Sequence, residues 1–470
     1  MKNSITQLCL SQALHQYISV LTLLLCTFGY VTTNAQCNVT SGQIKGAVFN
    51  DINNNGAKSI DETGIQGILV QAYGKNGALL SSSNTDANGN YTLTGLPDGE
   101  KIRVNFSYLS GYYSGVLGVN NASEVQFVTS PACNVDFGLT SDLDVCNNGT
   151  EIITTCFVQG ETTLRPAEPT IVGVAYGFNT TTPARKFAMH GETGSIWGLA
   201  YRSKTNEIFS ASFIKQYSGL RSGHDAIFKS SFNGGMFTSS LFVKLSNLGQ
   251  DVGTLSTTDV TDCNYGAQVG KMGLGSMVIS PDEQYLYVVN IYNNTLVRIQ
   301  IDNPTAANTV NYQIPGSNIH AFALKYYNGK IYAGTTEPGK KMYVWEFDPK
   351  TGVFTDTGLV LNAGSNWTSS PVVGGMPAFW LTDIDFSDKG DMLLSLSDRI
   401  GHVYCNNVSN RLHEQRGNLM IAFKNNSGGW TLEDRSHGGE FFGDDYWIAN
   451  PTYHPEITTG SIFAMPGTGS

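Results

Sequence analysis

Short apolar runs separated by clusters of Gly, Asn, Asp and Pro dominate the chain after about residue 40. Six such runs lie in the first part of this region, at residues 43–49, 65–73, 91–93, 101–106, 125–128 and 135–139. Turn signals such as Lys75-Asn76-Gly77 stand between them. The pattern predicts an all-β chain, with a β-sandwich at residues 37–140.

A coarser unit recurs later in the chain. It consists of a strand, a polar turn, a second strand, a connection and a third strand, and it begins at Gly194, Met277, Ala321 and Leu381. The spacing is irregular, roughly 40 to 80 residues, which is typical of propeller blades with insertions. We therefore predict a β-propeller over residues 170–470; an array of sandwiches is the alternative.

The last residues, from Gly460, begin like a further unit and then stop. Residues 170–175 and 186–189 are available to complete the ring. Because a propeller must hide its strand edges, we expect a small or incomplete propeller, truncated at the C-terminus.

The first 36 residues differ from the rest. Lys2 is their one formal charge, an apolar run covers residues 18–28, and small residues follow near Ala35. This predicts a secretory signal peptide at residues 1–36, too short to act as a transmembrane anchor. Removing it changes the net charge from −10 to −11, because it contains one lysine and no acid. Such an acidic, exported chain is unsuited to binding nucleic acid.

Six cysteines remain after the signal, an even number that favours disulfides in an exported protein. The preferred pairs are Cys37–Cys133, Cys146–Cys156 and Cys263–Cys405, although other connectivities stay open. Residues 141–169 are then expected to be a linker pinned by the second pair. A zinc site is the alternative, but the chain has no Cys-x-x-Cys spacing.

Residues 51–62 have the spacing of a twelve-residue calcium loop. Oxygen-bearing side chains alternate at the start, Gly stands at the sixth position for a sharp turn, and a carboxylate ends the loop. The candidate ligands are Asp51, Asn53, Asn55, the backbone oxygen of Ala57, Ser59, Asp61 and Glu62. The alternative is an Asn/Asp/Gly-rich surface turn. No helices flank the loop, so it is not an EF-hand.

Four ordered motifs resemble the B-type repeat of serine-aspartate repeat adhesins: residues 46–56, 62–67, 85–91 and 95–99. The resemblance implies a prealbumin-like or immunoglobulin-like β-sandwich that binds calcium and acts as a rigid spacer in surface proteins. The family often has Asp at the ninth loop position, where this chain has Ser59. Asp61, or a water bound by Ser59, would then complete the ligand set. The order of signal, B-type domain and propeller resembles large secreted proteins of the Bacteroidetes type.

The propeller region carries no recognised catalytic motif. Residues 280–290 resemble a blade of lactonase-like propellers. Asp383 and Asp385 share one face of a predicted strand, but acid–base roles need geometry. Four aromatic residues are candidates for a glycan platform, with packing as the favoured alternative: Trp367, Trp380, Tyr446 and Trp447.

The sequence thus predicts a non-enzymatic secreted or cell-surface protein. A calcium-stiffened stalk would present a propeller to an extracellular protein or glycan. A secreted propeller hydrolase with a spacer domain, lactonase-like or glycan-acting, is the alternative.

Overall fold

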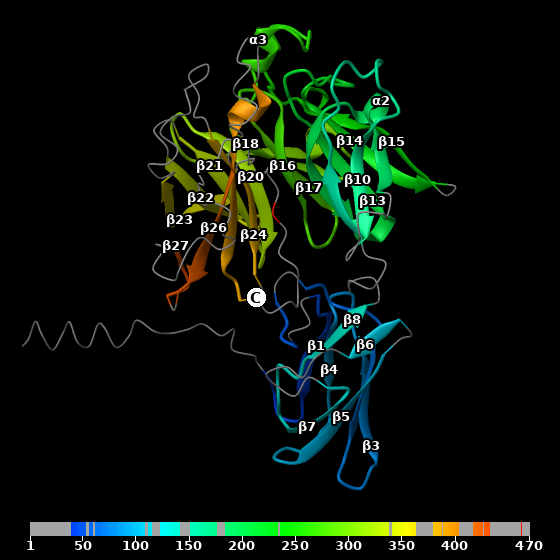
Figure 1. The fold of residues 1–470 in the computed structure, drawn as a ribbon. Helices are drawn as coiled ribbons and strands as arrows, with labels where there is room; N and C mark the ends of the chain where they lie inside the picture. Colours follow the sequence, from blue (N-terminus) through cyan, green and yellow to red (C-terminus); the bar gives the residue numbers. More distant parts are fainter. Residues whose placement is uncertain are drawn as a thin grey trace, which may run out of the picture.

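The structure is a computed structural model. It describes residues 39–52, 56–59, 62–108, 111–114, 123–141, 151–175, 184–233, 236–337, 341–362, 379–387, 389–403, 417–425, 427–432 and 462. The predicted signal peptide lies outside these residues. No helix among them is long and apolar enough to cross a bilayer. Strands predominate in two separate regions, a small lower one and a large upper one (Figure 1).

The lower region is a β-sandwich of two four-stranded sheets, as predicted. One sheet has the order β4-β1-β8-β6, with β4 (Asn90–Leu93), β1 (Ile44–Asn50), β8 (Phe137–Ser141) and β6 (Tyr112–Ser114). The other has the order β3-β2-β5-β7, with β3 (Leu79–Asn84), β2 (Leu69–Tyr73), β5 (Lys101–Ser107) and β7 (Val125–Thr129). The short strands β3 and β6 were not predicted.

Alternation of apolar and polar residues builds the core of the sandwich. In β5 the side chains of Ile102, Val104 and Phe106 are buried, while the residues between them face outward. The ring of Phe106 packs against that of Phe137 on β8, with centroids 4.9 Å apart. One hydrophobic core therefore joins the two sheets.

The upper region contains five sheets, the first with three described strands and the others with four. The first comprises β9 (Glu151–Thr155), β10 (Pro169–Ala175) and β11 (Arg185–Met189). The second comprises β12 (Ile196–Arg202), β13 (Glu207–Ser212), β14 (Ala226–Asn233) and β15 (Met236–Lys244). The third comprises β16 (Leu274–Ile279), β17 (Tyr285–Asn290), β18 (Thr295–Gln300) and β19 (Thr309–Gln313).

The fourth sheet comprises β20 (His320–Tyr327), β21 (Lys330–Thr336), β22 (Lys341–Asp348) and β23 (Val353–Asn362). The fifth comprises β24 (Phe379–Phe386), β25 (Met392–Asp398), β26 (Gly417–Lys424) and β27 (Trp430–Leu432). Two short helices, α2 (His190–Thr193) and α3 (Cys263–Gly266), lie in connections. The four units seen in the sequence correspond to the second to fifth sheets, each with a fourth strand added.

The first strands β12, β16, β20 and β24 lie side by side at the centre, which is the arrangement of a β-propeller. All four pair with their second strand through a register shift near the same place, after Ile196, Leu274, Ala321 and Leu381. This shared irregularity supports a common blade structure over the sandwich-array alternative.

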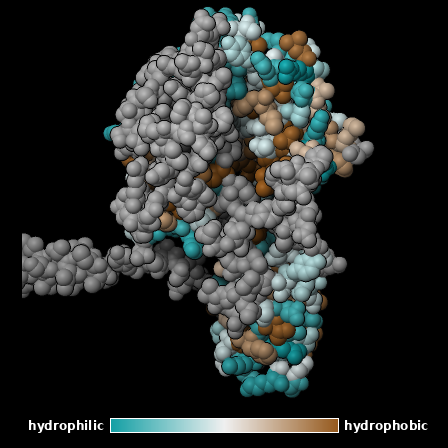
Figure 2. Space-filling model, in the orientation of Figure 1, coloured by the Kyte–Doolittle hydropathy of each residue, from teal (hydrophilic) through white to brown (hydrophobic). Residues whose placement is uncertain are grey.

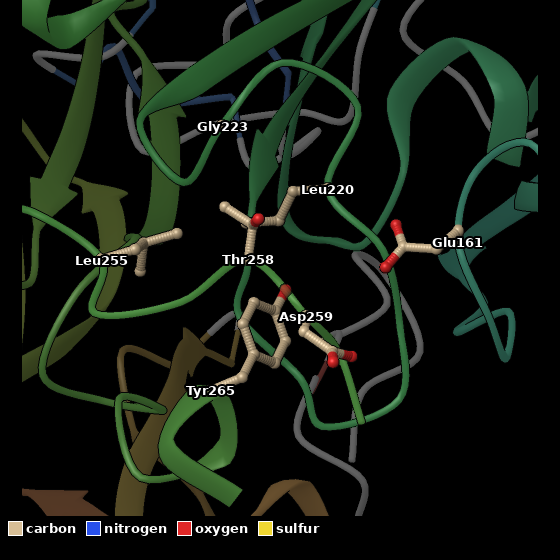
Figure 3. A pocket seen from close by; sticks show the side chains of 7 residues that line it. All are labelled: Glu161, Leu220, Gly223, Leu255, Thr258, Asp259 and Tyr265. Atoms are coloured by element: carbon tan, nitrogen blue, oxygen red, sulfur yellow. The ribbon is translucent and has the colours of Figure 1, made fainter. Parts of the chain in front are cut away.

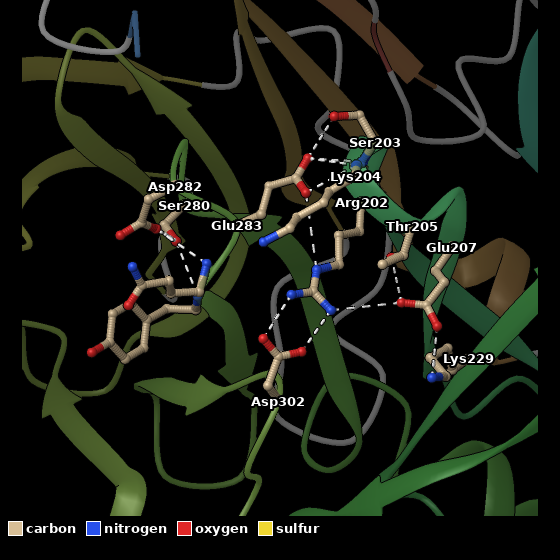
Figure 4. Close-up of polar contacts among 12 residues, drawn as sticks. Arg202, Ser203, Lys204, Thr205, Glu207, Lys229, Ser280, Asp282, Glu283 and Asp302 are labelled. Carbon is tan, nitrogen blue, oxygen red and sulfur yellow. Dashed lines mark hydrogen bonds and ion pairs between the residues drawn. The ribbon is translucent and has the colours of Figure 1, made fainter. Parts of the chain in front are cut away.

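A polar cluster joins the second sheet to the third (Figure 4). Arg202, at the end of β12, is only 5% exposed. Its guanidinium donates two hydrogen bonds to Asp302, at 2.8 and 3.0 Å. The carboxylate oxygens of Glu207 and Glu283 lie 3.8 and 3.9 Å from nitrogens of the same guanidinium. Because Arg202 belongs to one sheet and Asp302 follows a strand of the next, the cluster holds two blades together.

The segment expected to be a linker is partly ordered into the propeller. Residues 151–155 form β9, which pairs with β10 in the first sheet. Cys156 is a half-buried free thiol in this structure, so the predicted Cys146–Cys156 bridge is not formed there. Cys146, Cys37 and Cys405 lie outside the described residues. Cys263 is disulfide-bonded, and its pairing with Cys405 stays a prediction.

Candidate functional site

Two buried carboxylates stand at the two ends of the loop that leads from β1 towards β2. Asp51 is 0% exposed and Glu62 is 4% exposed. Asp51 Oδ2 accepts a hydrogen bond from the N–H of Gly56 at 2.8 Å, and Glu62 Oε2 accepts one from the N–H of Ser59 at 2.7 Å. The loop thus bends back on both acids. Burying two carboxylates is costly unless positive groups or donors surround them.

The predicted turn at the sixth loop position is confirmed. Gly56 has φ = +71°, in the left-handed region that favours glycine. Without this turn, the N–H of Gly56 could not reach the side chain of the residue that begins the loop.

The backbone fixes this loop to both ends of the sandwich. The N–H of Asn50 donates to the carbonyl of Thr63 at 2.9 Å, and the N–H of Asp51 donates to the carbonyl of Leu139, on β8, at 2.9 Å. Gly138 allows the close approach, because a Cβ there would lie 2.9 Å from Asp51 Oδ2. The loop is therefore held between the first and the last strand of the domain.

The remaining predicted ligands are only partly placed. Ala57 and Ser59 are described, with Ala57 exposed and Ser59 half-buried. Asn53, Asn55 and Asp61 lie outside the described residues. The part of the chain that the structure describes contains no group of three or more His, Cys, Asp or Glu side chains suited to a metal. The described candidate ligands, the carboxylates of Asp51 and Glu62 and the hydroxyl of Ser59, nevertheless carry oxygen atoms of the type that Ca²⁺ prefers.

Asp86 serves as a contrast within the same domain. Its carboxylate accepts hydrogen bonds from the N–H groups of Asn88 and Asn90, at 2.8 and 2.9 Å. This is a side chain that caps its own turn.

The centre of the propeller is filled by aromatic rings. Trp197 on β12 lies 5.2 Å from Phe322 on β20, which stacks 5.2 Å from Trp380 on β24. His402 stacks on Trp380 at 6.2 Å with an interplanar angle of 6°. Trp380 is only 2% exposed. It is therefore a packing residue and not part of a glycan platform; Trp367, Tyr446 and Trp447 lie outside the described residues.

A basic pair, the half-buried Lys215 and the buried His402, adjoins this aromatic cluster. Nζ of Lys215 lies 3.2 Å from Nδ1 of His402 and 4.9 Å from the centroid of the Phe157 ring. Burial lowers the pKa of Lys215 to about 8, and burial together with Lys215 and Arg399 lowers the pKa of His402. Sequence reasoning missed both residues, because each follows a strand in a connection with no motif.

The two aspartates expected on one face of a strand, Asp383 and Asp385, are engaged in structural contacts. Asp385 forms an ion pair with Lys325 of β20 at 2.6 Å. Asp383 accepts hydrogen bonds from the N–H groups of Ile384 and Ile462, at 2.9 and 3.0 Å. Burial raises the pKa of Asp383 to about 7. These contacts give the pair a role in holding strands together.

A cavity of about 490 Å³ opens among the propeller connections near α3 (Figure 3). Its lining combines carboxylates and hydroxyls with apolar groups: Glu161, Leu220, Gly223, Leu255, Thr258, Asp259 and Tyr265. The hydroxyl of Tyr265 donates to the carbonyl of Ser218 at 3.1 Å. Asp259 accepts two hydrogen bonds from Thr261, and these bonds lower the pKa of its carboxyl.

Comparison with known proteins identifies a related domain in the region of the β-sandwich. A family model matches residues 42–150. The match is the SdrD B-like domain. Serine-aspartate repeat-containing protein C of Staphylococcus aureus is 42% identical over 65 residues, which cover 14% of this chain and 7% of that protein. The resemblance seen in the sequence motifs is thereby confirmed.

Longer similarities join the SdrD B-like domain to the propeller. Colossin-B of Dictyostelium discoideum is 26% identical over 512 residues, covering 94% of this chain and 13% of that protein. Colossin-C of the same organism is 26% identical over 406 residues, covering 76% and 40%. The chain therefore spans less than half the length of these relatives.

Solved propellers are only distantly similar. The Cps50 (Swd1) β-propeller domain of Myceliophteria thermophila has a TM-score of 0.30 and 12% identity, covering 60% of this chain and 73% of that one. A putative 6-phosphogluconolactonase of Bacteroides uniformis has a TM-score of 0.31 and 11% identity, covering 78% and 94%. At these TM-scores neither carries an argument about function.

Proposed function

We propose that this protein is a non-enzymatic, adhesin-like protein of the cell surface. Its SdrD B-like domain would be a stalk stiffened by Ca²⁺, and its propeller would bind an extracellular protein or glycan. The similarity to serine-aspartate repeat proteins and colossins supports the surface role.

The observation that carries the calcium proposal is the burial of Asp51 and Glu62 at opposite ends of one loop. A cation bound by both would stabilise their charged forms in a buried environment, and carboxylate oxygens are ligands that Ca²⁺ prefers. Asn53, Asn55, Ser59, Asp61 and the carbonyl of Ala57 would complete the six to eight oxygen ligands typical of Ca²⁺.

Binding there would stiffen the stalk through the strands that hold the loop. Asp51 is bonded to β8 through its N–H, and Glu62 lies two residues before Gly64, which bridges to Phe49 of β1. A bound ion would therefore connect the first strand, the last strand and the chain leading to β2. Because only the folded loop converges these oxygens, binding stabilises the folded domain.

Calcium titration of the full chain by calorimetry tests this proposal. We expect one site in the wild type, with the affinity lowered at least about tenfold in Asp51→Asn, because a charged ligand is lost from the loop. Asp86→Asn is the matched control, since it removes a carboxylate from the same domain at a turn that caps itself. Absence of calcium binding, or equal loss in both variants, would refute the proposal.

The cavity near α3 is where the propeller would hold its ligand. Its carboxylates and hydroxyls are suited to a hydroxyl-rich ligand such as a glycan, and Leu220 and Leu255 offer an apolar wall. Glycan-array binding of the full chain, compared with Thr258→Trp, tests this. Thr258 is exposed and lines the cavity, so Trp fills it without disturbing the core. Binding that is unchanged in Thr258→Trp would place the ligand elsewhere.

A further inference from the structure

The first sheet of the propeller has one strand fewer than the others among the strands that the structure describes. Its order is β11-β10-β9, whereas each later sheet has four strands. β9 pairs with β10 along one edge, from Ile171 opposite Thr155 to Ala175 opposite Glu151. No described strand pairs with its other edge. An open edge presents a row of backbone N–H and C=O groups ready to pair with another strand.

The contacts of this sheet show which strand is lacking. β9 lies against β12, just as the second strands β13 and β17 lie against β16 and β20. β11 lies against β15, the outermost strand of its neighbour, as β23 lies against β27. β9, β10 and β11 therefore occupy the second, third and fourth places, and the vacant place is the innermost one.

A segment close to the end of the chain has the sequence of an innermost strand. Gly460-Ser461-Ile462-Phe463 differs only in its last residue from Gly194-Ser195-Ile196-Trp197, which leads into β12. Both last residues are aromatic. The two segments therefore fit the same place in a blade.

Ile462 lies beside the preceding sheet. Its N–H donates to Asp383 Oδ2, on β24, at 3.0 Å. Asp383 lies on β24, the innermost strand of the fifth described sheet. Ile462 is therefore beside the strand that a following innermost strand would neighbour, as β16 neighbours β12 and β24 neighbours β20.

Two other innermost strands make the same kind of contact. The N–H of Ala321 donates to Asn294 Oδ1 of the preceding sheet at 2.9 Å. The N–H of Leu381 donates to Thr336 Oγ1 of the preceding sheet at 3.2 Å. Ala321 and Leu381 are the residues that begin the register shift in their strands, as Ile196 does in β12. Ile462, which matches Ile196 in sequence, thus makes the contact that this position makes elsewhere.

The open sheet also presents apolar surface. Ile152 of β9 is 41% exposed, and Val172 and Val174 of β10 are half-buried. Hydrophobic residues gather over the front of this sheet, where β10 lies (Figure 2). A strand added at the edge of β9 would extend this face.

We propose that residues 460–465 add to the open edge of β9 as the innermost strand of the first sheet. The propeller would then be a ring of five sheets, with one sheet formed by segments that are about 300 residues apart in the chain. The occupant of the β9 edge is a segment of this chain and not a second molecule.

The second sheet gives the register. Ile196 pairs with Ser212, which precedes Phe213. Phe157 occupies the place of Phe213 in the first sheet: the two rings lie 5.8 Å apart, and both contact His402. Cys156, which precedes Phe157, is therefore expected opposite Ile462. Directly opposite residues of antiparallel strands have Cα atoms about 4.5 to 5.5 Å apart, within the range of a disulfide.

Cysteine cross-linking in the full chain tests the proposal. Ser461→Cys, Ile462→Cys and Phe463→Cys are each made with Cys146→Ser, oxidised, digested and analysed by mass spectrometry. We expect a peptide that links Cys156 to the new cysteine, most abundant in Ile462→Cys and abolished by Cys156→Ser. If no variant gives a link to Cys156, or if the link joins two copies of the chain, the proposal is overturned.

Hydrogen exchange gives an independent measurement. Deletion of residues 460–470 should speed amide exchange in β9 at least about tenfold, because its edge loses a partner strand. Deletion of residues 466–470 is the control, and exchange in β16–β19 reports whether the rest of the propeller stays folded. Unchanged exchange in β9, with β16–β19 protected, would contradict the proposal.

Discussion

Arg202 allows the sharpest test of how the propeller blades are held together. Its guanidinium is almost fully buried and belongs to β12, while its bidentate partner Asp302 belongs to the next sheet and has a side chain that is 69% exposed. Because the two partners of this ion pair differ in burial, substituting each of them should lower the free energy of unfolding by a different amount.

The larger loss in the free energy of unfolding is expected when Arg202, the buried partner, is replaced. Arg202→Met keeps much of the apolar volume but removes two charge-assisted hydrogen bonds, and it leaves Glu207 and Glu283 close together without their shared cation. Each retains other partners: Lys229 lies 2.7 Å from Glu207, and the N–H of Ser203 lies 2.8 Å from Glu283. We therefore expect a loss of about 2 to 4 kcal/mol in the free energy of unfolding, below the upper range for an orphaned buried charge.

The smaller loss in the free energy of unfolding is expected when Asp302, the exposed partner, is replaced. Asp302→Ala leaves Arg202 with Glu207 and Glu283, at 3.8 and 3.9 Å, and removes a carboxylate that water already screens. A loss below about 1 kcal/mol is expected, because exposed partners of ion pairs contribute little.

Urea denaturation followed by tryptophan fluorescence measures both values. All six tryptophans lie at or beyond residue 197, so their fluorescence reports on the propeller and not on the sandwich. Lys204→Met is the matched control, since this lysine is exposed and contributes its backbone N–H to the cluster. Equal losses for Arg202→Met and Asp302→Ala would refute the reasoning, as would a loss in Arg202→Met no larger than that of the control.

Three further predictions address other parts of the molecule. Burial raises the pKa of Asp383 to about 7, so the folded protein keeps a proton that the unfolded chain releases above about pH 4; this stabilisation is present at low pH and is lost as the pH rises through 7. Asp383→Asn should therefore be more stable than the wild type at pH 8, by up to about 4 kcal/mol, with little difference at pH 4, and an unchanged pH profile of the melting temperature would contradict this. Trp380→Ala should cost about 3 to 5 kcal/mol by urea denaturation, because it empties the centre of the propeller; a loss below about 1 kcal/mol would show that the centre can collapse. Gly138→Ala should weaken calcium binding in calorimetry, because its Cβ would lie 2.9 Å from Asp51 Oδ2, whereas Gly74→Ala in the same domain, where the nearest atoms lie 3.4 Å from the added Cβ, should not.

Most strands of the sandwich were predictable, because the residues that alternate as apolar in the sequence are the ones that the folded domain buries. Residues 101–106 alternate, and the structure buries Ile102, Val104 and Phe106 on one face. Strands β3 and β6 were missed because their residues are mostly polar or exposed, so no periodic apolar pattern identifies them. The loop at residues 51–62 was predicted from spacing, and the left-handed turn at Gly56 follows from the same spacing.

The propeller centre could not be predicted in this way. His402 and Lys215 are 187 positions apart, and only the packing of the sheets brings them to 3.2 Å. The same applies to Asp383, which the sequence identifies only as one of two carboxylates on the same face of a strand. The contacts of Asp383 depend on which strands of other sheets pack beside β24, and the local sequence does not specify this.

The sequence by itself therefore determined the all-β class, the domain order, the repeated blades and the oxygen-rich loop, because each depends on residues close together in the chain. Only the tertiary structure decided that β9 belongs to the propeller, that Asp51 and Glu62 are both buried, and that Ile462 lies beside Asp383. These are contacts between distant segments, and burial, register and electrostatics exist only once the sheets have assembled.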